Sequence, residues 1–378
     1  MKKITCKTRK NDAYRSYLHR TGRQSIHALR KKNKRLNISK SASVNRWIDA
    51  QIRDGLECDI KKNRDLFLTL PSLMNFSTNY HKTMQSIRTI RLLTGKKKYP
   101  THIYRLCFVD FSKVEYISAS AALVLTAELS KWDESVRQRL RPKVKSWNKN
   151  ILTQFDELGF FDLFKNKDSF ELEKEKEESP IKFVRYIKGH MKDDEKTLLF
   201  KSEIKRIVGE DLGQWTFLYS GLSEAITNVV QHAYPSGYGY DNDDKKWYLT
   251  ASYDCENKVI KVVFCDQGIT IPGSLPSSSK KEKILDYLTI FPFGEKMRDE
   301  HILRAAVEIQ RSSTGEVDRG KGLQDLLEFI KQRGKGYLSI MSGKGLYKYS
   351  ESDHKVDVKT ERFNLAVCGT LIIWSTQL

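Results

Sequence analysis

Residues 222–234 read LSEAITNVVQHAY, and their apolar residues recur at the spacing of an amphipathic helix, which we expect over residues 213–233. Glu224, Asn228 and His232 follow at intervals of four, so they lie along one stripe of that helix. A carboxylate and a carboxamide one turn apart can position a water molecule and a Mg²⁺ ion beside a polyphosphate. Taken alone, the stripe is also what a solvated helix face would show, and His232 is equally compatible with a packed or capping histidine.

A second group of residues follows an apolar strand that we expect over about residues 259–265, paired with one at 246–253. This strand runs into the sequence DQGITIP at residues 266–272. Asp266, at the strand end, can accept a hydrogen bond from an exocyclic amine such as that of adenine. Gly268 would let a ring approach the backbone, and Pro272 would stiffen the exit. A plain turn would have the same composition.

Two glycine-containing segments complete the C-terminal half. RGKGL at residues 319–323 opens a helix expected over 322–332, and glycines at a helix N-terminus expose backbone N–H groups to phosphate. Gly369 and Thr370 lead into the last apolar strand, expected over 370–375. Each element alone is common in unrelated proteins, whereas the four in this order and spacing are specific.

Together the four elements resemble the N box, G1 box, G2 box and terminal threonine strand of GHKL ATPases, over about residues 195–378. This is the Bergerat-fold family of gyrase, mismatch-repair ATPases and bacterial sensor kinases. LSEAITNVVQHAY is most similar to the anti-sigma-factor serine kinases within it. The resemblance implies a mixed sheet backed by helices on one face, with ATP and Mg²⁺ as ligands. It also leaves open a homodimer.

The resemblance implies a role for each matching residue. Glu224 would be the general base, Asn228 would hold Mg²⁺, and Asp266 would bind adenine. The other matches would lie beside the adenine or cradle the phosphates, and they are Gly268 and Thr370 at the base, and Arg319, Gly320, Lys321 and Gly322 at the phosphates.

Two departures from the family pattern concern the ATP lid. Thr270 stands where a second glycine is usual, and the stretch between Pro272 and Gly320, which would form the lid, is longer than in the small kinases. Both departures bear on lid geometry and turnover more than on nucleotide binding.

The N-terminal globular part contains CFVDFSKVEYISASAALVLTAEL at residues 107–129 and DELGFFDLF at 156–164. A strand at 104–111, a small-residue turn and a helix through Trp132 form half of an α/β unit, with a second helix expected over 151–164. The segment is similar to a STAS domain, the fold of anti-sigma-factor antagonists. Ser118 and Ala119 replace the family's Asp-Ser pair, with Ser120 as a substitute acceptor. The resemblance thus implies a docking module for a protein partner, and an ordinary α/β unit is the alternative.

Charge is unevenly distributed along the chain. The net charge is +20, and residues 1–50 hold 15 Lys or Arg against 2 acidic residues. Such a basic segment, interleaved with Tyr14, Tyr17 and Trp47, favours nucleic acid as a partner through residues 1–50. A solvated tail that aids solubility is the alternative.

The bulk properties predict a cytoplasmic α/β (α+β) protein without a membrane segment. The six cysteines are scattered, which argues against a zinc cage and against a disulfide scaffold. The charged sequence ELEKEKEESP at residues 171–180 indicates a linker. We therefore expect four parts: a basic segment at 1–65, a STAS-like α/β domain at 66–170, a linker at 171–194 and a GHKL-type domain at 195–378.

Three functions fit these features. The first is a Mg-ATP-binding ATPase that acts as a nucleotide-dependent switch on a protein or nucleic-acid partner. The second is a protein serine/threonine kinase of the anti-sigma type. The third is a non-catalytic regulator that senses ATP and binds nucleic acid.

Overall fold

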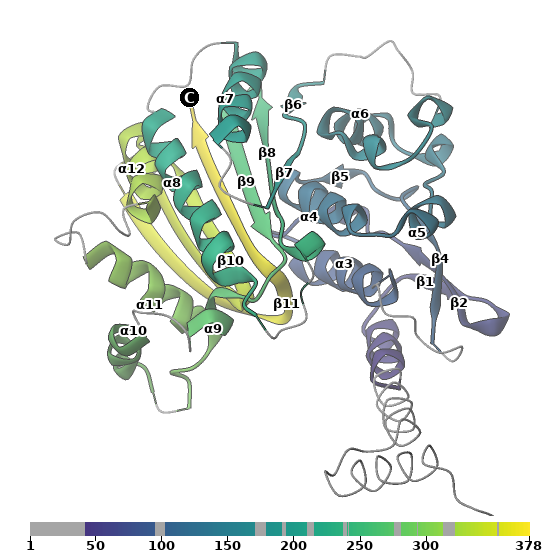
Figure 1. Cartoon of the computed structure of the whole chain (residues 1–378), viewed down its shortest axis with the longest axis horizontal. Helices are drawn as coiled ribbons and strands as arrows, with labels where there is room; N and C mark the ends of the chain where they lie inside the picture. Colours follow the sequence, from purple (N-terminus) through teal and green to yellow (C-terminus); the bar gives the residue numbers. More distant parts are fainter. Residues whose placement is uncertain are drawn as a thin grey trace, which may run out of the picture.

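The computed structural model describes most of the chain in two packed parts (Figure 1). The described residues are 42–94, 103–170, 179–190, 194–209, 215–236, 240, 242–275, 281–292, 294–312, 322–353 and 355–378. Both parts combine helices with sheets, so the α+β class expected from the sequence is confirmed. Of the described helices, none is long and apolar enough to cross a membrane.

The N-terminal part is built on two small sheets. Strands β2 and β4 pair in parallel and are joined by a crossover that contains α3, and β1 adds an antiparallel edge to β2. The strand expected at 104–111 and the helix expected after the small-residue turn are β4 and α4. A second, two-stranded sheet joins β3 and β5 in parallel. The elements are a helix over residues 42–53, β1 (Cys58–Ile60), β2 (Asp65–Thr69), β3 (Leu73–Met74), α3 (Tyr80–Thr94), β4 (Arg105–Asp110), β5 (Tyr116–Ile117), α4 (Ala119–Ser130), α5 (Glu134–Arg139) and α6 (Lys149–Leu158).

Two boundaries in this part differ from the sequence-based expectation. The basic segment was expected to reach residue 65, but the helix over 42–53 places Val44 and Ile48 in the core, so the domain begins at about residue 42. The helix expected over 151–164 ends at Leu158. Gly159 then adopts the left-handed φ of +83°, which a helix cannot continue through.

The C-terminal part is built on one large sheet in the order β10-β11-β9-β8-β6, with β7 also paired to β8. A mixed sheet was expected, yet every described pairing in it is antiparallel. Two of these pairings, β8–β9 and β10–β11, are hairpins, whose strands are always antiparallel. The elements are β6 (Ile181–Phe183), β7 (Ile187–Gly189), α7 (Asp194–Val208), α8 (Trp215–Asn228), β8 (Trp247–Asp254), β9 (Val259–Asp266), α9 (Ile271–Ser274), α10 (Lys281–Tyr287), α11 (Asp299–Ser312), α12 (Gly322–Arg333), β10 (Lys335–Ser352) and β11 (Lys355–Gln377).

The linker is shorter than expected. Residues 181–189, assigned to the linker at 171–194, form β6 and β7, and both strands pair with β8. The C-terminal domain therefore begins near residue 181 instead of 195. Residues 171–178 lie outside the described residues.

The large sheet is buried on both faces except at the hairpin end of β10 and β11. Helices α7, α8 and α12 cover one face, while α3 and α4 of the N-terminal part lie against the other (Figure 1). Alternate residues of β9 show this directly, since Val262 and Phe264 belong to the helix-side core and Val263 and Cys265 to the core shared with the N-terminal part. The N-terminal part is thus docked on the sheet of the C-terminal part.

The expected lid stretch has a small core of its own. Between β9 and β10 lie α9, α10 and α11, and Leu288 and Ala305 are among the six buried residues that pack together there. Residues 276–280 and 313–321 of this stretch lie outside the described residues. Helix α11 also packs on β10 and β11, and its Leu303 and Val307 belong to the helix-side core of the large sheet.

Candidate functional site

The first predicted motif lies at the C-terminal end of α8. The helix turns Leu218, Leu222 and Ile226 into the core, which leaves Glu224 half-buried and Asn228 exposed. The Asn228 side-chain amide donates to Glu224 Oε1 across 3.3 Å, so the carboxamide oxygen faces away from that bond. A π-helical turn over Val229–Ala233 follows at once, and such turns often mark functional sites.

Asp266 ends β9 and is almost completely buried, with 3% of its surface exposed. Its Oδ1 accepts a hydrogen bond of 2.8 Å from the Gly268 amide, and Thr370 donates to the same carboxyl through its amide and its hydroxyl. Three donors therefore orient this carboxyl group. The structure brings Thr370 to Asp266 and Gly268, from which it is more than 100 residues away in the sequence.

Burial raises the pKa of the Asp266 carboxyl to about 7, against the hydrogen bonds from Gly268 and Thr370, which favour the charged form. The carboxyl is therefore poised between its two protonation states near neutral pH. A carboxylate shielded from water forms stronger hydrogen bonds with an incoming amine than an exposed one does.

Gly268 has a structural reason to be glycine. A Cβ at this position would lie 2.1 Å from the Ala233 carbonyl oxygen, and the neighbouring Ile269 amide donates to that same oxygen across 2.7 Å. The loop after Asp266 is thus hydrogen-bonded to the π-helical turn that follows Asn228. The expectation that adenine also lies against Gly268 stays a prediction.

Two further residues shape this site: Ser342, which the sequence analysis did not single out, and Gly369, which it placed before the last strand. The Ser342 hydroxyl accepts from the Ile271 amide at 2.8 Å and lies 3.0 Å from the Thr370 hydroxyl, so it ties the start of α9 to β11. Gly369 adopts a φ of +80°, and a Cβ there would lie 2.3 Å from the Asp266 carbonyl oxygen. Only glycine lets β11 approach Asp266 this closely.

The phosphate-binding motif is described only at its end. Arg319, Gly320 and Lys321 lie outside the described residues, and Gly322 is the first residue of α12. Because α12 ends where β10 begins, beside the start of β9, its first turn points toward the opposite end of the sheet, where β9 ends at Asp266. Helices α12 and α8 pack side by side on this face (Figure 1).

The candidate metal ligands at the site are the side-chain oxygens of Glu224 and Asn228. The described residues contain no group of three or more His, Cys, Asp or Glu that would hold a metal ion by themselves. This donor set fits Mg²⁺, which usually takes only one or two protein oxygens and completes its shell with water and substrate phosphates.

No protein-family model matches this chain, and no curated protein matches it. The candidate site therefore rests on the motifs and on the contacts that join them.

The N-terminal part reaches the candidate site through a polar network. Glu128 of α4, whose side chain is 4% exposed, pairs with Arg91 of α3 at 3.1 Å. The same Glu128 oxygen accepts a hydrogen bond of 2.7 Å from the side-chain amide of Gln267, the residue after Asp266. Arg91 also reaches the Gln267 carbonyl at 3.5 Å. The N-terminal part thus holds the backbone next to the Asp266 carboxyl.

We expect Glu128→Ala to lower the free energy of unfolding by about 2–3 kcal/mol, because it leaves Arg91 and Gln267 without their buried acceptor. Arg91 is 31% exposed, which keeps the cost below that of a fully buried pair. The matched control is Glu57→Ala, which removes an exposed pair with Lys113 and should cost less than about 1 kcal/mol. Urea unfolding measures both, and equal losses would contradict a special role for the network.

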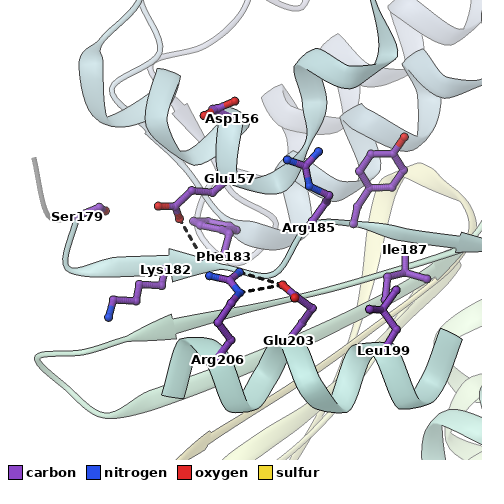
Figure 2. Close-up of a pocket in the computed structure, with 11 residues that line it drawn as sticks. Asp156, Glu157, Ser179, Lys182, Phe183, Arg185, Ile187, Leu199, Glu203 and Arg206 are labelled. Atoms are coloured by element: carbon purple, nitrogen blue, oxygen red, sulfur yellow. Dashed lines mark hydrogen bonds and ion pairs between the residues drawn. The ribbon is translucent and has the colours of Figure 1, made fainter. Parts of the chain in front are cut away.

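A separate cavity of about 720 Å³ lies between α6, β6 and α7 (Figure 2). Its wall contains none of the predicted site residues. Glu203 pairs with Arg206 at 2.9 Å, and Glu157 accepts a hydrogen bond of 3.0 Å from the Phe183 amide, so both carboxylates have partners within the protein. The cavity marks the junction of the two parts and is distinct from the site at Asp266.

Proposed function

We propose that the C-terminal part binds Mg-ATP and hydrolyses it slowly as a nucleotide-dependent switch that the N-terminal part senses. The observation that carries this proposal is the buried Asp266 carboxyl, oriented by Gly268 and Thr370 and joined to the end of the helix that bears Glu224 and Asn228. Among the described residues, no basic side chain is bonded to this buried acidic group, and such a group is costly to a fold, which favours a ligand-binding role.

The residues of the site divide the proposed work. Asp266 accepts a hydrogen bond from the adenine amino group, and Thr370 holds the carboxyl in place for it. Glu224 orients the attacking water and takes its proton. Asn228 would hold Mg²⁺, which neutralises phosphate charge when it is bound.

The network at Gln267 supports a link between nucleotide and N-terminal part. Gln267 adjoins Asp266 in sequence and bonds to Glu128 in α4. A shift of the Asp266 backbone on nucleotide binding therefore changes a buried contact between the two parts. The coupling that results equals the difference in contact energy between the two states of the loop.

The kinase alternative requires an acceptor outside this chain's STAS-like motif. Ser118 and Ser120 are 6% and 4% exposed, and their hydroxyls lie 3.1 Å apart. Ser118 also caps α4 by accepting from the Ala121 amide. Neither hydroxyl is accessible to a kinase, so a phosphate acceptor would belong to a partner protein.

Phosphate release from Mg-ATP by the purified full-length protein tests the proposal. Release without any partner supports a hydrolytic switch. ATP binding without release would leave the partner-directed kinase or the ATP-sensing regulator. The nucleic-acid contacts of that regulator would involve residues 1–50, of which 1–41 lie outside the described residues. Failure to bind ATP would remove all three functions.

A further inference from the structure

Part of strand β11 extends beyond its neighbour β9 in the large sheet. Strand β9 pairs with β11 only over Leu371–Gln377, while β10 pairs with β11 over residues 355–362, at Val367 and over residues 370–376. Over residues 355–361, β11 is therefore bonded to β10 on one side, and no described strand lies on its other side. Just after this stretch, the Tyr80 ring stacks on Phe363 at a centroid distance of 3.6 Å.

The free edge is exposed and partly apolar. Val356 is 57% exposed and Val358 is 37% exposed, and both lie on the same face of the strand. An unpaired strand edge of this kind presents backbone N–H and C=O groups that pair readily with another strand.

The sequence of this edge is complementary to itself. In an antiparallel pairing centred on Val358, each residue meets the one at the mirrored position of a second copy. Lys355 then lies opposite Glu361, and Asp357 lies opposite Lys359. Both cross-strand pairs join opposite charges, which favours pairing.

The other face of the same pairing joins β-branched residues. Val358 lies opposite its own counterpart, and Val356 lies opposite Thr360. Pairs of β-branched residues are favourable across antiparallel strands. The two-fold axis runs perpendicular to the sheet, so the helix-side face of one copy continues into that of the other.

We propose that this chain forms a symmetric dimer by pairing residues 355–361 of β11 with the same residues of a second copy. The contact is isologous and closed, so it stops at two chains. It lies on β11 beyond the Asp266 site and does not depend on nucleotide. The paired stretch is only seven residues long, which makes the dimer concentration-dependent.

Light scattering of the full chain over a range of concentrations, without nucleotide, tests this dimer. The wild type should approach twice the 43.9 kDa chain mass at high concentration. Asp357→Lys places lysine opposite Lys359, and Lys359→Asp places aspartate opposite Asp357, so each variant alone should dimerise at least tenfold more weakly. An equimolar mixture of the two variants restores opposite charges at every pair and should recover the dimer.

The matched control is Asp286→Lys, which makes the same charge change at an exposed position of α10 and should behave as the wild type. Recovery in the mixture excludes misfolding as the cause of weak dimerisation in the single variants. A wild type that stays monomeric at every concentration, or single variants that dimerise as tightly as the wild type, would overturn the proposal. Weak single variants whose mixture fails to recover would overturn the pairing register.

Discussion

Replacing Glu224 by alanine is expected to lower phosphate release from Mg-ATP by about two to four orders of magnitude, the usual loss when a general base is removed. Affinity for ATP should change little, because Glu224 acts on the attacking water and makes no proposed contact with adenine. The Asn228 amide loses only its 3.3 Å bond to Glu224, at a half-exposed position, so the fold should persist.

The matched control is Glu256→Ala, which removes an exposed glutamate in the turn between β8 and β9, at the end of the sheet away from Asp266. Phosphate release and ATP binding are measured on both variants and the wild type. Full turnover in Glu224→Ala would remove this residue from the mechanism, even if ATP binding is retained.

Asp266→Asn is expected to weaken ATP binding by about 100-fold or more, because the asparagine amide cannot accept both the Gly268 bond and an adenine amine as a carboxylate does. Calorimetric titration measures this loss. The control is Asp254→Asn, at the far end of β8, where the carboxylate accepts from the Asn257 amide and side chain and lies away from the site. Equal affinity in the wild type and Asp266→Asn would contradict adenine binding at Asp266.

The pKa of Asp266, raised by burial to about 7, adds a pH signature. Adenine needs the ionised carboxylate as acceptor, so ATP affinity should fall by up to about tenfold for each pH unit below 7. Asp266→Asn should lose this dependence along with its affinity. A wild-type affinity that is flat between pH 8 and pH 6 would show that Asp266 does not accept from the ligand in its charged form.

Stability should follow the opposite direction. Asp266 holds its proton in the folded state up to about pH 7, whereas the unfolded chain loses it near pH 4. Folding is therefore favoured below pH 4 and progressively less favoured as the pH rises to 7. Relative to Asp266→Asn, the wild type should lose on the order of 2–4 kcal/mol between pH 4 and pH 7, measured as the difference between their free energies of unfolding.

Patterns local in sequence predicted the elements that carry the candidate site. Apolar runs separated by a turn placed β8 and β9, which the structure confirms within a residue at each end. Helical periodicity placed α8, although the turn after Asn228 is π-helical, which a 3.6-residue repeat does not reveal. The sequence predicted two short strands, at 337–341 and 347–350, in place of β10 and two more, at 361–367 and 370–375, in place of β11. Gly343 and Gly369 interrupt the apolar pattern there while the backbone continues through a bulge.

Contacts between distant segments had no sequence signal. Gln267 meets Glu128 across 139 positions and Arg91 across 176, so neither contact follows from spacing along one element. Strands β6 and β7 have three residues each, too few for any period, which is why residues 181–189 were assigned to a linker. Docking of the N-terminal part on the sheet could not be predicted either. Both faces of these strands are apolar, so the sequence does not show which element covers which face.

The central claim is that Asp266 recognises adenine, and comparing the affinities for two nucleotides tests it most directly. Adenine presents an amino group where guanine presents a carbonyl oxygen, so a carboxylate acceptor attracts the first and repels the second. Calorimetric titration of the full-length wild type at pH 8 with Mg-ATP and Mg-GTP should give at least about 100-fold tighter binding of ATP. Equal affinities for the two nucleotides, or no binding of either, would contradict the account.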